Sequence, residues 1–214
     1  MNFSNNWVVP VLKDFTKLVS DDQRYFCIGS VSLLSFTKEF YNREIKDIDI
    51  ICDVLNFEII RNGLKKFGYK QYTFINKKFP FYKQLFKLSK SKYFRFEKNG
   101  RNLEIMTSDF GHSKNEISIE MYPKVAFNFP SIGVIDSSFN GSHFKAVSPE
   151  TLYCIYSFGL KTWGRFTRTK IDQRKNDLKQ LEKIINKNKL KQIASNIFLK
   201  IGPLKVKIPA NFIL

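Results

Sequence analysis

The sequence predicts an α+β fold in which helices flank a mixed β-sheet and a mainly helical segment follows. Apolar and polar residues alternate over 45–52, which is the period of a strand, and apolar residues recur at helical spacing over 55–67. With 214 residues, the chain is long enough for one domain with an appendage. We expect the domain at 1–147 and a basic helical segment with a strand-like tail at 148–214.

Local signals give the order of the elements. Asn99-Gly100 between two alternating runs predicts a β-hairpin, and Ser148-Pro149 is typical of a helix start. The stretch 108–147 is rich in Ser, Asn, Gly and Pro, so we expect it to be mostly irregular. In chain order, the expected elements are a helix at 8–19, a strand at 24–28, a helix that begins at 31–36, a strand at 45–52, a helix at 55–67, strands at 93–97 and 102–107, short strands at 117–121 and 143–147, helices at 149–162 and 171–188, and a strand-like tail at 203–213.

The composition excludes several classes of protein. No apolar run is long enough to span a bilayer, and the first residues lack the pattern of a secretory signal. The three cysteines are widely spaced, which excludes a disulfide framework and a cysteine zinc site. Only two histidines are present, so histidine-rich metal chemistry is not expected. These features predict a soluble cytoplasmic protein that has no membrane partner.

The positive charge is concentrated in two segments. The chain has 36 Lys and Arg against 19 Asp and Glu, a formal net charge of +17. Residues 77–101 hold nine basic side chains and one acid, and residues 151–214 hold fourteen basic side chains and three acids. The rest of the chain is close to neutral, a distribution typical of a surface that contacts a polyanion. Lysine enrichment from an AT-rich genome is the alternative explanation.

A glycine and three acids form the candidate chemical site. Gly29-Ser30 follows a predicted strand and opens a helix, where backbone amides can approach a phosphate. Asp47 and Asp49 lie on one face of a strand, with Cα atoms about 6.5–7 Å apart. Both can therefore share divalent metal ions, and Glu104 on a hairpin strand is the candidate third carboxylate. The other acids that could replace these ligands are Asp53 and Asp109.

These residues carry a resemblance to a known family. Residues 28–53 read IGSVSLLSFTKEFYNREIKDIDIICD, which resembles the Gly-Ser, helix and D-x-D signature of the nucleotidyltransferase fold in the DNA polymerase beta superfamily. Residues 99–106, NGRNLEIM, resemble the strand that bears the third acid of that superfamily. Residues within 146–181 resemble the C-terminal segment of minimal and lincosamide-type antibiotic nucleotidyltransferases and of AbiE-type toxin nucleotidyltransferases. The resemblance implies a nucleotidyltransferase-type mixed sheet.

The resemblance also implies roles for individual residues. Gly29 and Ser30 are expected to hold the phosphates of an NTP such as ATP, and Arg43 to contact its triphosphate. Glu104 completes the metal site or acts as the base on the acceptor hydroxyl. The residues expected to bind Mg²⁺ or Mn²⁺ are Asp47, Asp49 and Glu104.

The C-terminal segment matches the motif of the AbiE-type toxins less closely than residues 28–53 match the Gly-Ser and D-x-D signature. Asp177 matches its acid, and either Lys170 or Arg174 matches its base. The second helix of the motif usually carries a lysine where this chain has Tyr156, and Lys161 is an approximate substitute. We therefore expect Lys161, Lys170 and Asp177 to contribute to nucleotide binding.

The acceptor of the nucleotide remains open between alternatives. An RNA end, such as that of tRNA, is favoured by the basic segments, in which lysines alternate with aromatic residues on which bases can stack. A small hydroxylated molecule, as for antibiotic nucleotidyltransferases, is the second alternative, and a non-catalytic nucleotide- or RNA-binding module is the third. An antitoxin partner is also left open by the resemblance. The residues expected to bind RNA are Lys83, Lys87, Lys90, Lys92 and Arg95.

Overall fold

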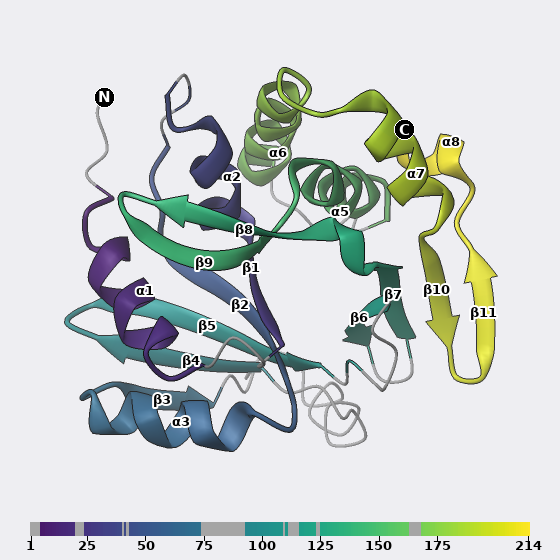
Figure 1. Ribbon diagram of the computed structural model, residues 1–214. Coiled ribbons are helices and arrows are strands. Elements are labelled where there is room, and N and C mark those ends of the chain that lie inside the picture. Colours follow the sequence, from purple (N-terminus) through teal and green to yellow (C-terminus); the bar gives the residue numbers. More distant parts are fainter. Residues whose placement is uncertain are drawn as a thin grey trace.

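The computed structural model contains two β-sheets and helices that cover them (Figure 1). It confirms the expected α+β class, with a mixed sheet flanked by helices and helices in the C-terminal segment. No described helix is long and apolar enough to cross a bilayer. The structure describes all residues except 1–4, 20–23, 40, 42, 74–92, 109, 111–115, 123–124 and 163–167.

The larger sheet has seven strands in the order β3-β4-β5-β2-β1-β9-β8. β2 pairs in parallel with β5, and β1 in parallel with β9, while the other neighbours are antiparallel. The centre of this mixed sheet is therefore formed by strands from distant parts of the chain. The strands are β1 (Tyr25–Ile28), β2 (Asp47–Asp53), β3 (Lys70–Thr73), β4 (Tyr93–Lys98), β5 (Arg101–Ser108), β8 (Val134–Phe139) and β9 (Ser142–Val147).

The central strands β2 and β5 bury one face and place their acids on the other. Ile48 and Ile50 of β2 are buried, as are Leu103 and Ile105 beside them on β5. These side chains join one hydrophobic core with α1 (Val8–Thr16), α2 (Gly29–Thr37) and α3 (Phe57–Lys66). Because successive side chains of a strand alternate between faces, burial of the isoleucines directs the intervening aspartates to the opposite face.

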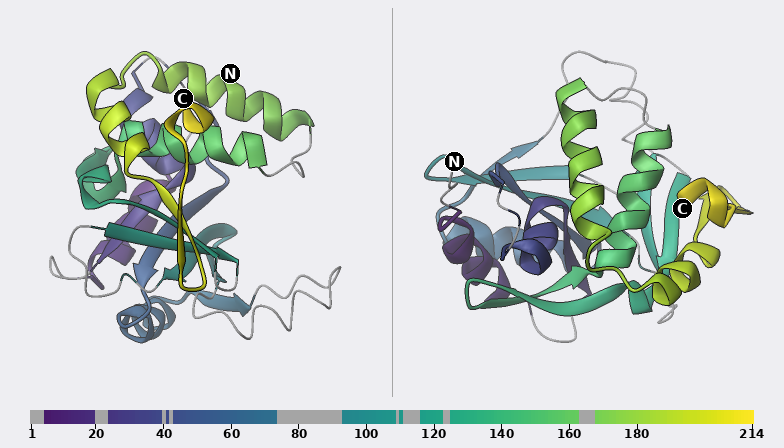
Figure 2. Two further views of the ribbon diagram at one scale, coloured as in Figure 1. Left: turned by 90° about the vertical axis from the view of Figure 1, so that its right-hand side faces the viewer. Right: turned by 90° about the horizontal axis from the view of Figure 1, so that it is seen from above.

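The smaller sheet joins the C-terminal segment to the preceding strands. Its four strands lie in the order β11-β10-β7-β6, and the hairpin β10–β11 runs along one side of the molecule (Figure 2). Strands from both sides of residue 147 therefore build this sheet, and the expected division of the chain at that residue remains a prediction. The elements are β6 (Glu116–Tyr122), β7 (Val125–Pro130), η1 (Ser131–Gly133), α5 (Pro149–Thr162), α6 (Arg168–Leu181), α7 (Lys187–Ser195), β10 (Phe198–Ile201), β11 (Leu204–Lys207) and α8 (Ala210–Ile213).

Three local expectations were wrong. The stretch 108–147 is largely regular, because it contains β6 to β9, and Asn140 and Gly141 form a hairpin turn with φ values of 47° and 79°. The expected helix at 171–188 ends at Leu181, and Asn186 starts a separate helix, α7. The expected tail strand is a hairpin followed by the short helix α8.

Candidate active site

The pairing of the central strands lines up polar side chains from three elements. Asp49 of β2 lies opposite Glu104 of β5, and Glu104 lies opposite Arg95 of β4. Opposite residues in neighbouring strands direct their side chains to the same face of a sheet. Ile28, the last residue of β1, pairs with Asp49 on the other side. These paired residues form a row across the sheet, and the row ends where β1 is followed by α2.

Three carboxylates converge on this row. One oxygen from each of Asp47, Asp49 and Glu104 lies within 4.8 Å of those from the other two. The two aspartates are partly buried and Glu104 is 6 % exposed. Carboxylate oxygens are the ligands that Mg²⁺ and Mn²⁺ prefer, so this donor set fits such an ion. Asp53, the described alternative, instead accepts a hydrogen bond from the backbone of Leu55 (3.1 Å).

The carboxylates repel one another in the absence of a cation. Burial, followed by the charges of Asp47 and Glu104, raises the pKa of Asp49 to about 8. Burial and the charge of Asp47 raise the pKa of Glu104 to about 7, against the attraction of Lys170. A divalent cation at this position removes the repulsion, because it interacts favourably with every ionised carboxylate. The electrostatics of the cluster therefore favour a bound cation.

Gly29 and Ser30 lie directly beside this cluster. Gly29 has a φ of +69°, and a Cβ atom at this position would overlap Oδ2 of Asp49. No side chain caps the N-terminus of α2, and its first turn contains no acid. The backbone N–H groups of a helix start carry partial positive charge and bind phosphate readily. The first turn of α2 therefore offers an anion-binding surface next to the three carboxylates.

A buried polar network connects this helix start to the C-terminal segment. Arg43 donates hydrogen bonds to Oγ of Ser30 (2.8 Å) and to Oδ2 of Asp177 (2.6 Å). The Asp177 side chain is only 1 % exposed, and its other oxygen accepts a hydrogen bond from Tyr41 (2.9 Å). Arg174 of α6 lies 3.9 Å from the same carboxylate, and its guanidinium carbon lies over the ring of Tyr156, at 3.3 Å from the ring centroid. The network thus joins α2, the loop before β2, α5 and α6.

The other predicted site residues lie in different surroundings. Lys170 is exposed on α6, and its charge acts on Glu104. Lys161 donates to the backbone oxygen of Phe212 (2.8 Å), and no interaction of the described residues connects it with the carboxylates. Arg95 binds Oε1 of Glu104 through two nitrogens, at 2.6 Å and 3.0 Å. The predicted RNA-binding residues outside the described part of the chain are Lys83, Lys87, Lys90 and Lys92.

Two residues near this site make contacts that the sequence did not lead us to expect. Tyr156 was noted only as a departure from a motif, but its buried ring supports Arg174. Arg95 was assigned to RNA, although the hairpin register places it opposite Glu104. The turn at Asn99-Gly100 fixes that register, so the pairing of Arg95 with Glu104 could have been derived from the sequence.

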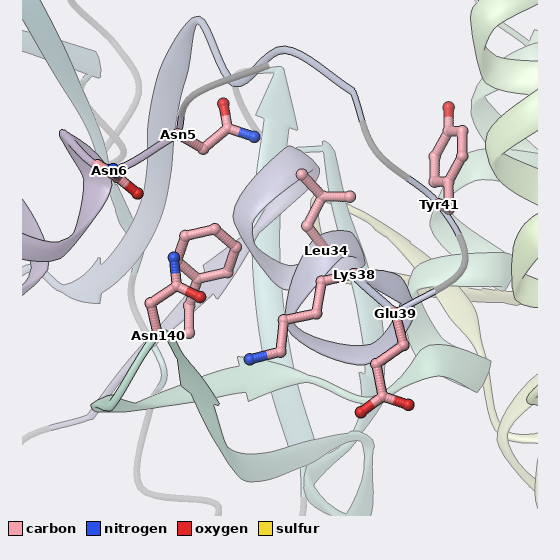
Figure 3. A pocket seen from close by; sticks show the side chains of 8 residues that line it. Asn5, Asn6, Leu34, Lys38, Glu39, Tyr41 and Asn140 are labelled. Carbon is pink, nitrogen blue, oxygen red and sulfur yellow. The ribbon is translucent and has the colours of Figure 1, made fainter. Parts of the chain in front are cut away.

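A separate cavity of about 350 Å³ lies near the C-terminal end of α2 (Figure 3). Leu34, Lys38 and Asn140 are among the residues that line it, and none of the three carboxylates does. Asn5, at its edge, donates to the backbone oxygen of Arg43 (2.9 Å) and accepts from the backbone of Ile45 (3.0 Å). This corner of the molecule therefore supports the loop that carries Arg43.

Comparison with known proteins gives matches among solved structures. No family model and no curated protein sequence matches the chain. The lincosamide antibiotic adenylyltransferase LnuA, in a lincomycin-bound structure, has a TM-score of 0.57 and 16% identity, and the match covers 86% of this chain and 100% of LnuA. The antibiotic-resistance factor ANT(2'')-Ia, in complex with adenylyl-2''-tobramycin, has a TM-score of 0.57 and 10% identity, over 87% of this chain and 94% of that one. Together with the sheet order and the carboxylate row, these matches show that the chain has the nucleotidyltransferase fold.

Proposed function

We propose that this protein is a divalent-metal-dependent nucleotidyltransferase that moves NMP from an NTP to an acceptor hydroxyl. The observation that carries the proposal is the convergence of Asp47, Asp49 and Glu104 beside the uncapped N-terminus of α2. Carboxylates that hold cations and backbone amides that hold phosphates are the two components that nucleotidyl transfer requires. The match to nucleotidyltransferases over most of the chain supports the same function.

The site suggests a direct displacement at the α-phosphorus. The acceptor oxygen forms a bond to this phosphorus on one side, the bond to the β-phosphate oxygen breaks on the other, and pyrophosphate leaves. Asp47, Asp49 and Glu104 would hold Mg²⁺ or Mn²⁺, which neutralise charge on the phosphates when bound. In this proposal Glu104 accepts the proton of the acceptor hydroxyl, because it is the third carboxylate of the cluster that holds the cations. The first turn of α2 holds the phosphates.

For the acceptor we propose an RNA end, with tRNA as the first candidate. The support is the net charge of +17 and its concentration in two segments, because phosphate contacts dominate the binding of RNA by proteins. A small hydroxylated molecule is the second candidate, and the similarity to two antibiotic nucleotidyltransferases favours it. The excess of positive charge disfavours a polycationic acceptor, because like charges repel.

The test is the transfer of label from each α-³²P-labelled NTP in turn, with Mg²⁺, to total tRNA and separately to small hydroxylated compounds. Asp47→Asn and Asp49→Asn should each reduce transfer at least about 100-fold, because the metal site loses a charged ligand. Asp53→Asn on the same strand is the matched control and should retain activity. Full activity of a folded Asp47→Asn, Asp49→Asn double variant would overturn the proposal. Label in small compounds but not in tRNA would exclude RNA as the acceptor.

A further inference from the structure

Arg95 and Glu104 form an ion pair beside the carboxylate cluster. The two residues lie opposite each other in the register of β4 and β5, so their side chains leave the same face of the sheet. Nε and Nη2 of Arg95 donate to Oε1 of Glu104, at 3.0 Å and 2.6 Å. The Glu104 side chain is buried, whereas 35% of the Arg95 side chain is exposed. A buried carboxylate is therefore held by a guanidinium that reaches it from a more exposed position.

The geometry of this pair differs from the common arrangement of arginine and carboxylate. In the fork-to-fork arrangement, the guanidinium donates one hydrogen bond to each carboxylate oxygen. Here both bonds go to Oε1, so Arg95 fixes the orientation of the carboxylate without using Oε2. Glu104 also has an oxygen within 4.8 Å of oxygens from Asp47 and Asp49. The pair therefore suits a carboxylate that must keep an oxygen for a cation.

The packing of β4 fixes the strand that carries Arg95. Its neighbours in the strand, Phe94 and Phe96, belong to the opposite face of the sheet, because successive side chains alternate. Phe96 is fully buried, and Phe94 stacks on Phe57 of α3 with ring centroids 4.2 Å apart. A side chain on a well-packed strand keeps its geometry better than one on a loop. The place of Arg95 beside Glu104 is therefore set by contacts that do not depend on a bound cation.

We infer that Arg95 is the positioning residue of Glu104, which it orients so that one oxygen remains for the cation held by Asp47 and Asp49. This inference rests on the proposed function and adds a residue to the same site. It also separates Arg95 from the residues expected to bind RNA, because its guanidinium already serves a buried carboxylate. Groups that hydrogen-bond to metal ligands orient them, and their loss weakens metal binding about 10- to 100-fold.

The test is a titration with Mn²⁺ alone, followed by the electron paramagnetic resonance signal of the free ion. Arg95→Gln should weaken Mn²⁺ binding about tenfold or more, because Glu104 loses the contact that orients it. Loss of a positive charge near a cation would by itself strengthen binding, so a weakening indicates orientation. Lys98→Gln is the matched control and should bind Mn²⁺ like the wild type. Lys98 lies on the same strand, its side chain is also 35% exposed, and it pairs with Asp14 at 3.0 Å.

Two further variants distinguish orientation from charge. Arg95→Lys keeps the charge but has one nitrogen in place of a planar set of donors, so it should still bind Mn²⁺ more weakly than the wild type. If Arg95 acts through Glu104, the Arg95→Gln, Glu104→Gln double variant should bind Mn²⁺ no more weakly than Glu104→Gln alone. Wild-type affinity in Arg95→Lys, or additive losses in the double variant, would overturn the inference.

The outcomes separate this inference from the proposed function. If the wild-type protein binds no Mn²⁺, both the proposed function and the inference fail. If it binds Mn²⁺, and Arg95→Gln binds it as tightly as Lys98→Gln does, only the inference is wrong. Urea unfolding in EDTA checks that each variant is folded, and Arg95→Lys, which keeps an ion pair, carries the test if Arg95→Gln does not fold.

The binding of tRNA gives an independent check on Arg95. Arg95→Gln should leave the slope of log K against log salt concentration unchanged, because the guanidinium is committed to Glu104. Loss of a phosphate contact would instead reduce the slope by about 0.7 to 0.9. A reduction of that size would show that Arg95 serves RNA, and it would overturn the inference.

Discussion

Gly29 occupies a position where only glycine fits for two separate reasons. Its φ of +69° is unfavourable for a residue with a Cβ, and a Cβ atom would overlap Oδ2 of Asp49. The backbone cost of alanine in this region is about 1–2 kcal/mol. The overlap adds a displacement of the Asp49 carboxylate, which lies in the candidate metal site. A substitution here therefore acts on function as well as on stability.

Gly29→Ala should abolish Mn²⁺ binding and nucleotidyl transfer in a protein that remains folded. Gly68→Ala is the matched control, because Gly68 has a φ of +86° and a methyl group there would meet no atom within 4 Å. Both variants should lose about 1–2 kcal/mol in urea unfolding from the backbone, and Gly29→Ala should lose more because of the overlap with Asp49. Only Gly29→Ala should lose the metal. Normal Mn²⁺ affinity in Gly29→Ala would mean that Asp49 is not a ligand.

The raised pKa values of Asp49 and Glu104 predict how stability depends on pH. In the unfolded chain both groups ionise near pH 4, whereas in the metal-free fold they hold their protons until about pH 8 and about pH 7. The native state therefore binds more protons in this window, so stability falls as pH rises from about 4 to 8. The slope is on the order of 1.4 kcal/mol per pH unit for each such group while the pH lies between its unfolded and its folded pKa.

Thermal melting in EDTA between pH 5.5 and 8.5 checks this prediction. The melting temperature of the wild-type protein should fall with pH, and Asp49→Asn should show a weaker fall, because one of the repelling carboxylates is gone. Mn²⁺ should raise the melting temperature most at high pH, where the ionised carboxylates bind it best. Parallel curves for wild type and Asp49→Asn would contradict the assignment of the raised pKa.

At the residue scale, the sequence predicted the acids better than the basic residues around them. Asp47, Asp49 and Glu104 could be placed from alternation within strands, because burial of the neighbouring apolar residues decides the face. For the basic residue of the C-terminal motif, the sequence left a choice between Lys170 and Arg174. Nothing in local spacing says that α6 lies against Tyr156 or that Asp177 reaches Arg43, since these contacts join residues 18 to 134 positions apart.

At the scale of elements, α7 depends on the residue that caps its N-terminus, Asn186. The side chain of Asn186 accepts hydrogen bonds from the backbone of Asn188 (3.0 Å) and of Lys189 (3.1 Å). The backbone N–H of Asn186 itself donates to the buried carboxylate of Glu150 on α5 (3.0 Å). Leu190 and Ile193 of α7 pack with Leu152 and Tyr156 of α5 in a second hydrophobic core. The cap therefore positions a helix that helps to build this core.

Asn186→Ala should lower the free energy of unfolding by about 1 kcal/mol, because two backbone donors of α7 lose their acceptor. Asn188→Ala, two residues along the same turn, is the control and should be neutral or slightly stabilising, since its side chain is exposed and alanine favours a helix. Urea unfolding followed by circular dichroism measures both. Equal effects of the two substitutions would show that the cap contributes nothing.

Two hairpins show why some elements were predictable and others were not. Asn99-Gly100 and Asn140-Gly141 have the same turn geometry, with positive φ at both residues. The first pair lies between runs with clear alternation, whereas β8 (Val134–Phe139) carries Asp136, Ser137 and Ser138. Its burial pattern does not alternate, because it is an edge strand that packs on α2. The turn signal was present, but the strand signal beside it was weak.

At the scale of the whole molecule, charge and fold are determined separately. The apolar patterns that build the two cores lie in the near-neutral part as well as in the basic C-terminal segment. Positive charge therefore adds little information about the fold, and it bears instead on the partner. Part of it serves the molecule itself, because Arg43 and Arg95 pair with buried carboxylates. The lysines of the two basic segments, 77–101 and 151–214, are the candidates for contacts with RNA phosphates.

Replacement of Lys83, Lys87 and Lys90 by glutamate should weaken binding of tRNA and reduce its dependence on salt. Each phosphate contact contributes about 0.7 to 0.9 to the slope of log K against log salt concentration, so loss of three contacts should reduce the slope by roughly 2. The control replaces three exposed lysines outside both basic segments, Lys17, Lys65 and Lys70, with the same change in net charge. Fluorescence anisotropy with labelled tRNA between about 50 and 200 mM salt measures both slopes. If the two triple variants lose affinity and slope equally, the effect comes from net charge alone, and the segment 77–101 is not an RNA-binding surface.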